Sequence, residues 1–471
     1  MHERTTRALA RWLFVGCCAA PTGLTMLAIL VTWTPWYHHR ARHAIESRVA
    51  LMTGLRVEIG DFDRADPSTW RLTDVRLSDP ETLQPVASVR SLQWISQSEN
   101  TVIRLSQPEI RVESLEQVAE LLHYRFLCQP DQTRVPVRIA ADDVTLRGSS
   151  TAQTIQDFDA WLETRENTVW ATVRCIPAGH RQDSEGIQIE VTRNRGTSPP
   201  TTAWSLQTGE VHLPLAVLAD YYPFLNRLGA DATFDGSFAG TRQDGITDPA
   251  WSVNLAGHFR DIDLGQLTQN LPHQVRGRGM ISIDRCQLDQ DWSVNVAGQL
   301  TADEGWMSAS LLPRLAEDLG CRLAVATADD FSFDALALRF DLYSAQLRVE
   351  GICRSLPGRE WLPAEVVVSA GGRPIVFSSA KWTDSLNLAR LFAPSHSVWI
   401  PLSGQTSGLL SILRPPRHAL PQNGLASDMP VASDMPVSRA GDRVLEDTEP
   451  AARISRLQPH RGETTPVSQP R

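Results

Sequence analysis

The chain has 471 residues, a formal net charge of -9, 42% hydrophobic residues and 21% charged residues. This composition is ordinary for a folded protein and allows a sizeable core. The acidic balance argues against a nucleic-acid-binding protein, because such a protein needs a basic surface to neutralise phosphates. The 7 cysteines are scattered without a C-x-x-C pair, which disfavours a zinc site and leaves one or two disulfides open.

The first element is an uncharged segment from Trp12 to Tyr37. Residues 13–33 alone would form a helix of about 31 Å, which is long enough to span a bilayer. A cleaved signal peptide is the rival reading, but no small-x-small site ends the segment, which favours an uncleaved anchor at 12–34. Arginines flank it on both sides, so the charge rule leaves the orientation open. The basic, histidine-rich collar at 38–43 is predicted to face lipid head groups and not a metal.

After the collar, short alternating runs predict strands separated by polar turns, interrupted by a few helices. Helices are expected at 41–52 and from a capping box, Ser114-Leu-Glu-Gln117, to about Cys128. Two more are expected at 215–228, kinked or split by Pro223, and at 309–319. The predicted strands lie at 55–60, 70–78, 87–94, 102–105, 109–113, 135–139, 144–146, 169–176, 187–191, 232–240, 251–259, 279–284, 292–300, 335–342, 345–352, 364–368 and 374–378.

An internal repeat gives the clearest sign of a sheet, because Trp251-Ser-Val-Asn-Leu-Ala-Gly257 returns as Trp292-Ser-Val-Asn-Val-Ala-Gly298. Alternate residues of a strand face the same side, so each copy presents a row of apolar side chains. The pattern predicts a long antiparallel meander. Gly257 and Gly298 could mark bends within the strands or the ends of the strands, and strand ends are favoured. The predicted apolar row contains Trp251, Val253, Leu255, Phe259, Trp292, Val294, Val296 and Leu300.

No signature of enzyme chemistry occurs in the sequence: there is no Walker loop, G-x-S-x-G, H-E-x-x-H or G-x-G-x-x-G. Aspartate pairs at 142–143 and 329–330 precede alternating runs, where aspartates favour turns over cation sites. The glycine pairs near 277 and 371 suit hairpins better than phosphate loops. Four histidines, at 180, 212, 258 and 273, are isolated in the sequence. We therefore expect a non-enzymatic protein without a catalytic site, metal or cofactor.

The order of elements resembles that of AsmA-like proteins of Gram-negative envelopes. The resemblance rests on the single span, the collar, Leu55-Arg-Val-Glu-Ile-Gly60, Arg71-Leu-Thr-Asp-Val-Arg-Leu-Ser-Asp79 and Phe333-Asp-Ala-Leu-Ala-Leu-Arg-Phe-Asp341, and covers about residues 10–380. It implies an inner-membrane anchor with the bulk of the chain in the periplasm. It also implies kinship with TamB-like and bridge-like lipid-transfer proteins, whose long curved sheet holds acyl chains on an apolar concave face. The family offers no site residues to transfer.

The expected fold class is therefore mainly β: a transmembrane helix, an elongated, curved antiparallel sheet of the repeating β-groove type and a disordered tail. Two functions remain open. The first is a lipid-binding groove, lined by the eight residues of the predicted apolar row, that assists lipid transport or outer-membrane biogenesis, with membrane lipids and other envelope proteins as partners. The second is a periplasmic scaffold with a closed β core, which would show the same alternation. The predicted regions are 1–11 (tail), 12–34 (transmembrane helix), 35–134 (AsmA-like strands and amphipathic helix), 135–411 (repeating sheet) and 412–471 (disordered tail).

Overall fold

The computed structural model describes residues 12–391, with gaps at 33, 67, 130–134, 150, 181–183, 245–249, 289–293, 326–328 and 344. Trp292 of the repeat lies in one of these gaps. The predicted tails at 1–11 and 412–471 also lie outside the described residues.

The first described segment is a long apolar helix that begins at Trp12 and includes a π-helical turn, η1 (Val15–Ala19), and α2 (Ala20–Thr32). From Trp12 to Val31 it is long and apolar enough to cross a membrane, and none of that stretch is buried in the protein. Its large side chains are exposed, as at Leu24 and Met26. An apolar helix surface that is not buried in protein is suited to lipid, so this segment agrees with the predicted span.

A second helix, α3 (Pro35–Thr53), connects the apolar segment to the sheet. Thr34 caps it by accepting a hydrogen bond from the Tyr37 amide at 3.4 Å, and Gly54 ends it in a left-handed conformation. The predicted helix at 41–52 is therefore confirmed and longer than expected. Arg42 in the collar donates to the carbonyl oxygen of Gly60 at 3.1 Å, so this side chain contacts the sheet.

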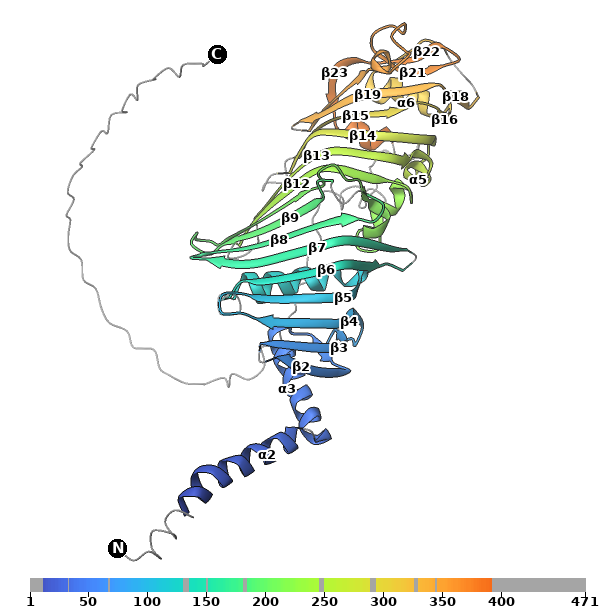
Figure 1. The fold of residues 1–471 in the computed structure, drawn as a ribbon. Helices are drawn as coiled ribbons and strands as arrows, with labels where there is room; N and C mark the ends of the chain where they lie inside the picture. Colours follow the sequence, from blue (N-terminus) through green and yellow to red (C-terminus); the bar gives the residue numbers. More distant parts are fainter. Residues whose placement is uncertain are drawn as a thin grey trace, which may run out of the picture. The chain divides into compact units, whose positions relative to one another are not determined.

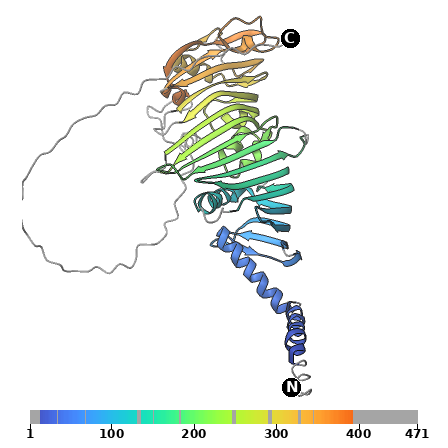
Figure 2. The same ribbon diagram turned by 60° about the vertical axis from the view of Figure 1, so that its left-hand side comes forward.

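The described strands form one large, open, curved sheet of 23 strands, which confirms a mainly β fold (Figure 1). From β2 to β10, from β12 to β15, and then through β19 and β20, neighbouring strands pair in chain order, and Figure 2 shows the curvature from a second direction. The strands are β1 (Arg56–Glu58), β2 (Asp61–Asp66), β3 (Thr69–Ser78), β4 (Pro85–Ser96), β5 (Thr101–Arg111), β6 (Val137–Arg147), β7 (Ala152–Arg165), β8 (Thr168–Pro177), β9 (Ile187–Asn194), β10 (Thr201–Gln207), β11 (Leu213–Pro214), β12 (Thr233–Gln243), β13 (Ala250–Asp263), β14 (Val275–Leu288), β15 (Val294–Ala302), β16 (Gly305–Met307), β17 (Arg322–Leu323), β18 (Phe331–Phe333), β19 (Ala335–Tyr343), β20 (Gln346–Gly351), β21 (Val366–Ala370), β22 (Arg373–Phe377) and β23 (Ser379–Asp384).

One pair of strands departs from the predicted antiparallel meander, because β5 and β6 are parallel. Between them the chain forms α4 (Leu115–Leu121) and a π-helical segment, η3 (Leu122–Leu127), which carry it back to the starting end of β5. A parallel pair needs such a crossover. The predicted helix thus exists, but not its capping box: the Ser114 side chain makes no cap hydrogen bond, and Gln117 donates to Asp79 Oδ2 at 2.7 Å.

The helices cover one face of the sheet, which we call the inner face. On it α3 packs against β1 to β5, and η3 packs against β8 and β9 through the cluster of Leu127, Val169, Ala171 and Val191. The predicted helix at 215–228 is split at Pro223 into two 3-10 helices, η5 (Leu215–Leu218) and η6 (Pro223–Leu228), as its proline required. Both pack on the inner face near β12 and β13.

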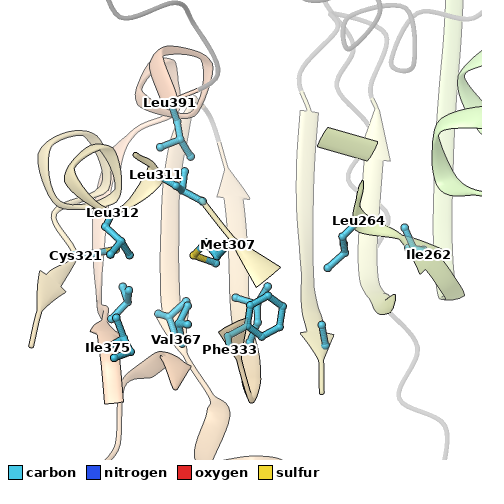
Figure 3. Packing of buried hydrophobic residues seen from close by; sticks show 14 residues of the cluster. Ile262, Leu264, Met307, Leu311, Leu312, Cys321, Phe333, Val367, Ile375 and Leu391 are labelled. Atoms are coloured by element: carbon cyan, nitrogen blue, oxygen red, sulfur yellow. The ribbon is translucent and has the colours of Figure 1, made fainter. Parts of the chain in front are cut away.

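The largest apolar cluster closes the C-terminal part of the inner face. The helices α5 (Leu264–Thr268), α6 (Leu311–Leu319) and α7 (Leu386–Leu391) contribute to it together with β16, β18, β21 and β22. In Figure 3 the side chain of Leu311 from α6 points toward Met307, which is 2% exposed. Each fully buried side chain of this size stabilises the fold by roughly 1.5 to 3 kcal/mol, so this part of the sheet has a closed protein core.

Candidate functional site

Cross-strand pairing arranges the inner face of the repeat region into rows. One row runs Trp204, Gly240, Val253, Leu288 and Val294 across β10, β12, β13, β14 and β15. The next runs Leu206, Phe238, Leu255, Cys286 and Val296, and a row farther along the strands holds Phe234, Phe259, Ile281, Leu300 and Leu338. The two copies of the repeat therefore place equivalent residues on the same face, as the sequence predicted.

One end of these strands, which we call the glycine end, is closed by protein. Phe259 packs against both the C-terminal cluster and the cluster formed by η5 and η6. Leu300 packs against the first of these clusters and Leu255 against the second. These three predicted groove residues have protein neighbours but remain half-buried, and Leu255 lies in the same cross-strand row as Phe238 and Val296.

The other end of the same strands is less enclosed. Six half-buried or exposed apolar residues lie together there, and we call them the tryptophan strip: Trp204, Phe238, Trp251, Val253, Val294 and Val296. Phe238 is 37% exposed although it lies on the inner face. Among the apolar clusters that the described residues form, only the η3 cluster includes one of these six, Trp204.

The rings of Trp204 and Trp251 stack within the tryptophan strip, with ring centroids 5.3 Å apart and an interplanar angle of 10°. On the intervening strand β12, the register partner of Trp204 is Gly240, which has no side chain, and the partner of Trp251 is Arg242. Leu288, the register partner of both Val253 and Val294, is buried. The strip thus combines two stacked indoles with half-buried aliphatic side chains.

Gly257 and Gly298 lie inside β13 and β15, so the prediction that they mark strand ends is wrong. Gly257 is directly opposite Gly236, and the pairing of β13 with β14 shifts between Leu255 and Gly257. A Cβ atom on Gly236 would lie only 2.5 Å from the Cα atom of Gly257, because the two backbones approach closely. Glycine is needed for this approach, and the register shift bends the strand between the two ends.

A row of charged residues borders the tryptophan strip at the extreme end of the strands. Arg193, Thr202, Arg242 and Trp251 are successive partners across β9, β10, β12 and β13. Arg193 is 6% exposed and donates to Thr202 Oγ1 at 2.7 Å and to Asp244 Oδ2 at 2.6 Å. The guanidinium of Arg242 lies 5.5 Å from the ring centroid of Trp251. These residues carry no sequence motif, and only the strand register brings them together.

Three histidines that are isolated in the sequence meet on the outer face. Asp235 accepts a hydrogen bond from Arg260 Nε at 2.6 Å, and its carboxylate lies 3.1 Å from His258 Nδ1 and 3.5 Å from His212 Nδ1. The ring of His180 lies 6.4 Å from that of His212. Burial alone would raise the pKa of Asp235, but the hydrogen bond and charge of Arg260, together with His258, lower it overall. The carboxylate is therefore held in its charged form.

The remaining candidates for chemistry lie apart. Asp142 and Asp143 lie within β6, so their prediction as turn residues is wrong, whereas Asp330 lies outside the strands and accepts from the Ala309 amide at 2.9 Å. Gly371 and Gly372 form the β21–β22 hairpin, but Gly277 lies inside β14. All seven cysteines are described and all are free. No metal site is found among the described residues, because no group of three or more His, Cys, Asp or Glu side chains there is placed to hold a metal ion.

A polar depression of about 750 Å³ lies over β3 to β8. Charged and amide side chains line it, among them Arg76, Arg90, Gln107, Glu109 and Asp143. Arg90 donates to Gln107 Oε1 at 3.1 Å, so part of the lining is internally paired. This depression offers little apolar surface, and an acyl chain would gain nothing by entering it.

No family model matches the chain, no curated protein matches its sequence and no solved structure matches its fold.

Proposed function

We propose that this chain is a membrane-anchored protein of the AsmA-like type that binds lipid acyl chains on the tryptophan strip and so assists lipid transport or envelope assembly. One observation carries the proposal: Trp251, Val253, Val294 and Val296 belong to none of the apolar clusters that the described residues form, whereas Leu255, Phe259 and Leu300, which are equally half-buried, pack against two of them. An apolar surface of this kind gains free energy when an acyl chain removes it from water, at roughly 25 cal/mol per Å².

Two further features support an acyl chain as the occupant. The apolar N-terminal helix would hold the sheet next to a bilayer, which is the source of lipid. The stacked indoles of Trp204 and Trp251 present a broad apolar surface beside a charged edge, and tryptophan is the residue enriched where acyl chains meet polar groups. Both features fit a lipid better than a soluble polar ligand.

The scaffold remains the second candidate, and the closed clusters at the glycine end favour it. Leu255, Phe259 and Leu300 need no lipid to bury their side chains, because η5, η6 and α5 already contact them. If the whole inner face were closed in this way, the repeat would serve only to hold the sheet together.

Lipid retention separates these two functions. The full chain, purified in a neutral detergent, is analysed by native mass spectrometry beside the double variant Val253→Glu/Val294→Glu. We expect bound phospholipid on the wild type, and its loss from the variant with an unchanged circular dichroism spectrum. A wild-type chain that never carries lipid would favour the scaffold.

The topology is part of the same proposal: a single inner-membrane span with the sheet in the periplasm. Trp361 is 56% exposed and lies far along the chain from the span. A Trp361→Cys variant in intact cells with a permeabilised outer membrane should react with a membrane-impermeant maleimide to a greater extent than the wild-type chain, whose seven cysteines are also free. Labelling only after lysis of the inner membrane would reverse the orientation.

A further inference from the structure

Among the residues that the structure describes, the charged row at the border of the tryptophan strip holds two arginines, Arg193 and Arg242, for one carboxylate, Asp244. Arg193 and Arg242 both pair with Asp244, and the charges of these three groups and of Arg195 act on the Cys128 thiol. Asp244 is shared: its Oδ2 lies 2.6 Å from Arg193 Nη2 and its Oδ1 lies 3.3 Å from Arg242 Nε. One carboxylate therefore serves two guanidinium groups.

The guanidinium of Arg195 is hydrogen-bonded to the backbone. Arg195 Nε and Nη2 donate to the carbonyl oxygen of Leu127 at 2.9 and 2.6 Å, at the C-terminal end of η3. The negative end of the helix dipole offsets part of this charge. The unbalanced charge is thus that of the pair formed by Arg193 and Arg242.

Burial makes this imbalance costly. Arg193 is 6% exposed, and the side chain of Arg242 is 17% exposed. In the part of the chain that the structure describes, the Nε atoms of both arginines and Asp244 Oδ1 are buried without a hydrogen bond of good geometry, although Asp244 Oδ1 lies 3.3 Å from Arg242 Nε. A buried guanidinium that lacks its own anion is unfavourable, and a further anion beside it would be stabilised.

We propose that Arg242 and Arg193 bind the phosphate head group of an anionic lipid whose acyl chain lies on the tryptophan strip. Arginine suits this ligand, because its planar guanidinium donates paired hydrogen bonds to phosphate oxygens. The geometry matches an amphiphile, since Arg242 lies directly opposite Trp251 in the register and Trp251 stacks on Trp204. This inference rests on the proposed lipid function and adds the charge of the lipid.

A second arginine–tryptophan pair in the sheet provides a matched control. Arg348 lies 5.2 Å from the ring centroid of Trp382 and 3.6 Å from Asp341 Oδ2, as Arg242 lies over Trp251 and beside Asp244. In that pair the neighbouring Arg339 has its own carboxylate, Glu350, at 3.9 Å. The charges there balance, so no anion is expected.

The experiment compares the full chain and three variants, Arg242→Gln, Asp244→Asn and Arg348→Gln, in neutral detergent micelles. The probes are fluorescent phosphatidic acid, the diacylglycerol with the same chains, and inorganic phosphate, whose effect on Tm is measured. We expect Arg242→Gln to weaken phosphatidic acid binding about tenfold and to leave diacylglycerol binding unchanged. Asp244→Asn should strengthen phosphatidic acid binding and enlarge the rise in Tm with phosphate, whereas Arg348→Gln should behave as wild type.

The possible results lead to different conclusions. Binding of both lipids that is equal in all variants overturns the head-group site but leaves the acyl-chain function standing. A third result is that the chain binds neither lipid, but inorganic phosphate raises its Tm and Arg242→Gln abolishes that rise. The anion site would then stand as a site for free phosphate, and the proposed lipid function would be wrong. If Arg242→Gln lowers Tm too far for a binding assay, the test rests on Asp244→Asn. Binding of phosphatidic acid by Asp244→Asn that is no tighter than binding by the wild type contradicts the proposal.

Discussion

The two ends of β15 have the same alternation in sequence and different surroundings in the fold. At the glycine end Leu300 packs against the cluster that α5 and α6 complete. At the tryptophan end Val294 and Val296 are half-buried and belong to none of the clusters that the described residues form. A period of two reports which face a residue occupies, but the cover of that face comes from segments far away in the chain.

The largest expected effect comes from placing a charge at each end of this one strand. Leu300→Glu would place a carboxylate against the apolar cluster and should cost roughly 2 to 3 kcal/mol, whereas Val294→Glu, at a residue outside the clusters of the described residues, should cost roughly 1 kcal/mol. Thermal unfolding of the full chain in neutral detergent measures both. Equal losses of stability would mean that the tryptophan end is as closed as the glycine end.

The bend between the two ends gives a smaller effect. Gly236→Ala would force a Cβ atom against the backbone of Ala256 and Gly257 and should destabilise the protein by about 1 to 3 kcal/mol. Gly240→Ala on the same strand is the control, because its Cβ atom would meet only side-chain atoms at 3.6 Å or more and should cost under about 0.5 kcal/mol. If Gly236→Ala proves as stable as the control, the close approach of these strands is wrong.

The smallest effect concerns the outer face and depends on pH. Asp235→Asn should lower stability by roughly 1 kcal/mol at neutral pH, because the ion pair with Arg260 is partly exposed. The folded pKa of Asp235 is lowered, so its contribution is present above the ordinary value of 3.8 and is lost as the pH falls through the lower folded value. The Tm difference between wild type and variant should therefore shrink below that pH. A difference that stays constant down to low pH would exclude the carboxylate as its source.

Sequence periodicity predicted the sheet where its alternation is unbroken, as in β15 and in β13 up to Phe259. It missed β7, because Asp157 has a positive φ of 50° and the register shifts between Gln156 and Asp159, which places Ile155 and Phe158 on the same face despite their odd spacing. The same cause divided β5 into two predicted strands at Gln107, which has a φ of 51°. A bulge changes the parity of a strand, and a fixed period of two fails on both sides of it.

The candidate site was predicted only in part, because the segments that cover or pair with the repeat are distant in the sequence. The repeat identified Trp251, Val253, Val294 and Val296, but the same rule included Leu255, Phe259 and Leu300, whose protein cover depends on η5, η6 and α5. Arg193, Arg242 and Asp244 become neighbours only when β9 pairs with β10 and β10 with β12. No spacing along the chain signals such a cluster, since the pairing partners are set by the whole sheet.

The most direct test is to identify, by crosslinking in intact cells, the molecules that contact Val296. A photo-crosslinking benzophenone residue is placed at position 296 on the inner face and, as the control, at position 299 on the opposite face of the same strand, and the adducts are identified by mass spectrometry. The account predicts phospholipid adducts at 296 and none at 299. Adducts only to protein at 296, or equal lipid labelling at both positions, would contradict a lipid-binding tryptophan strip.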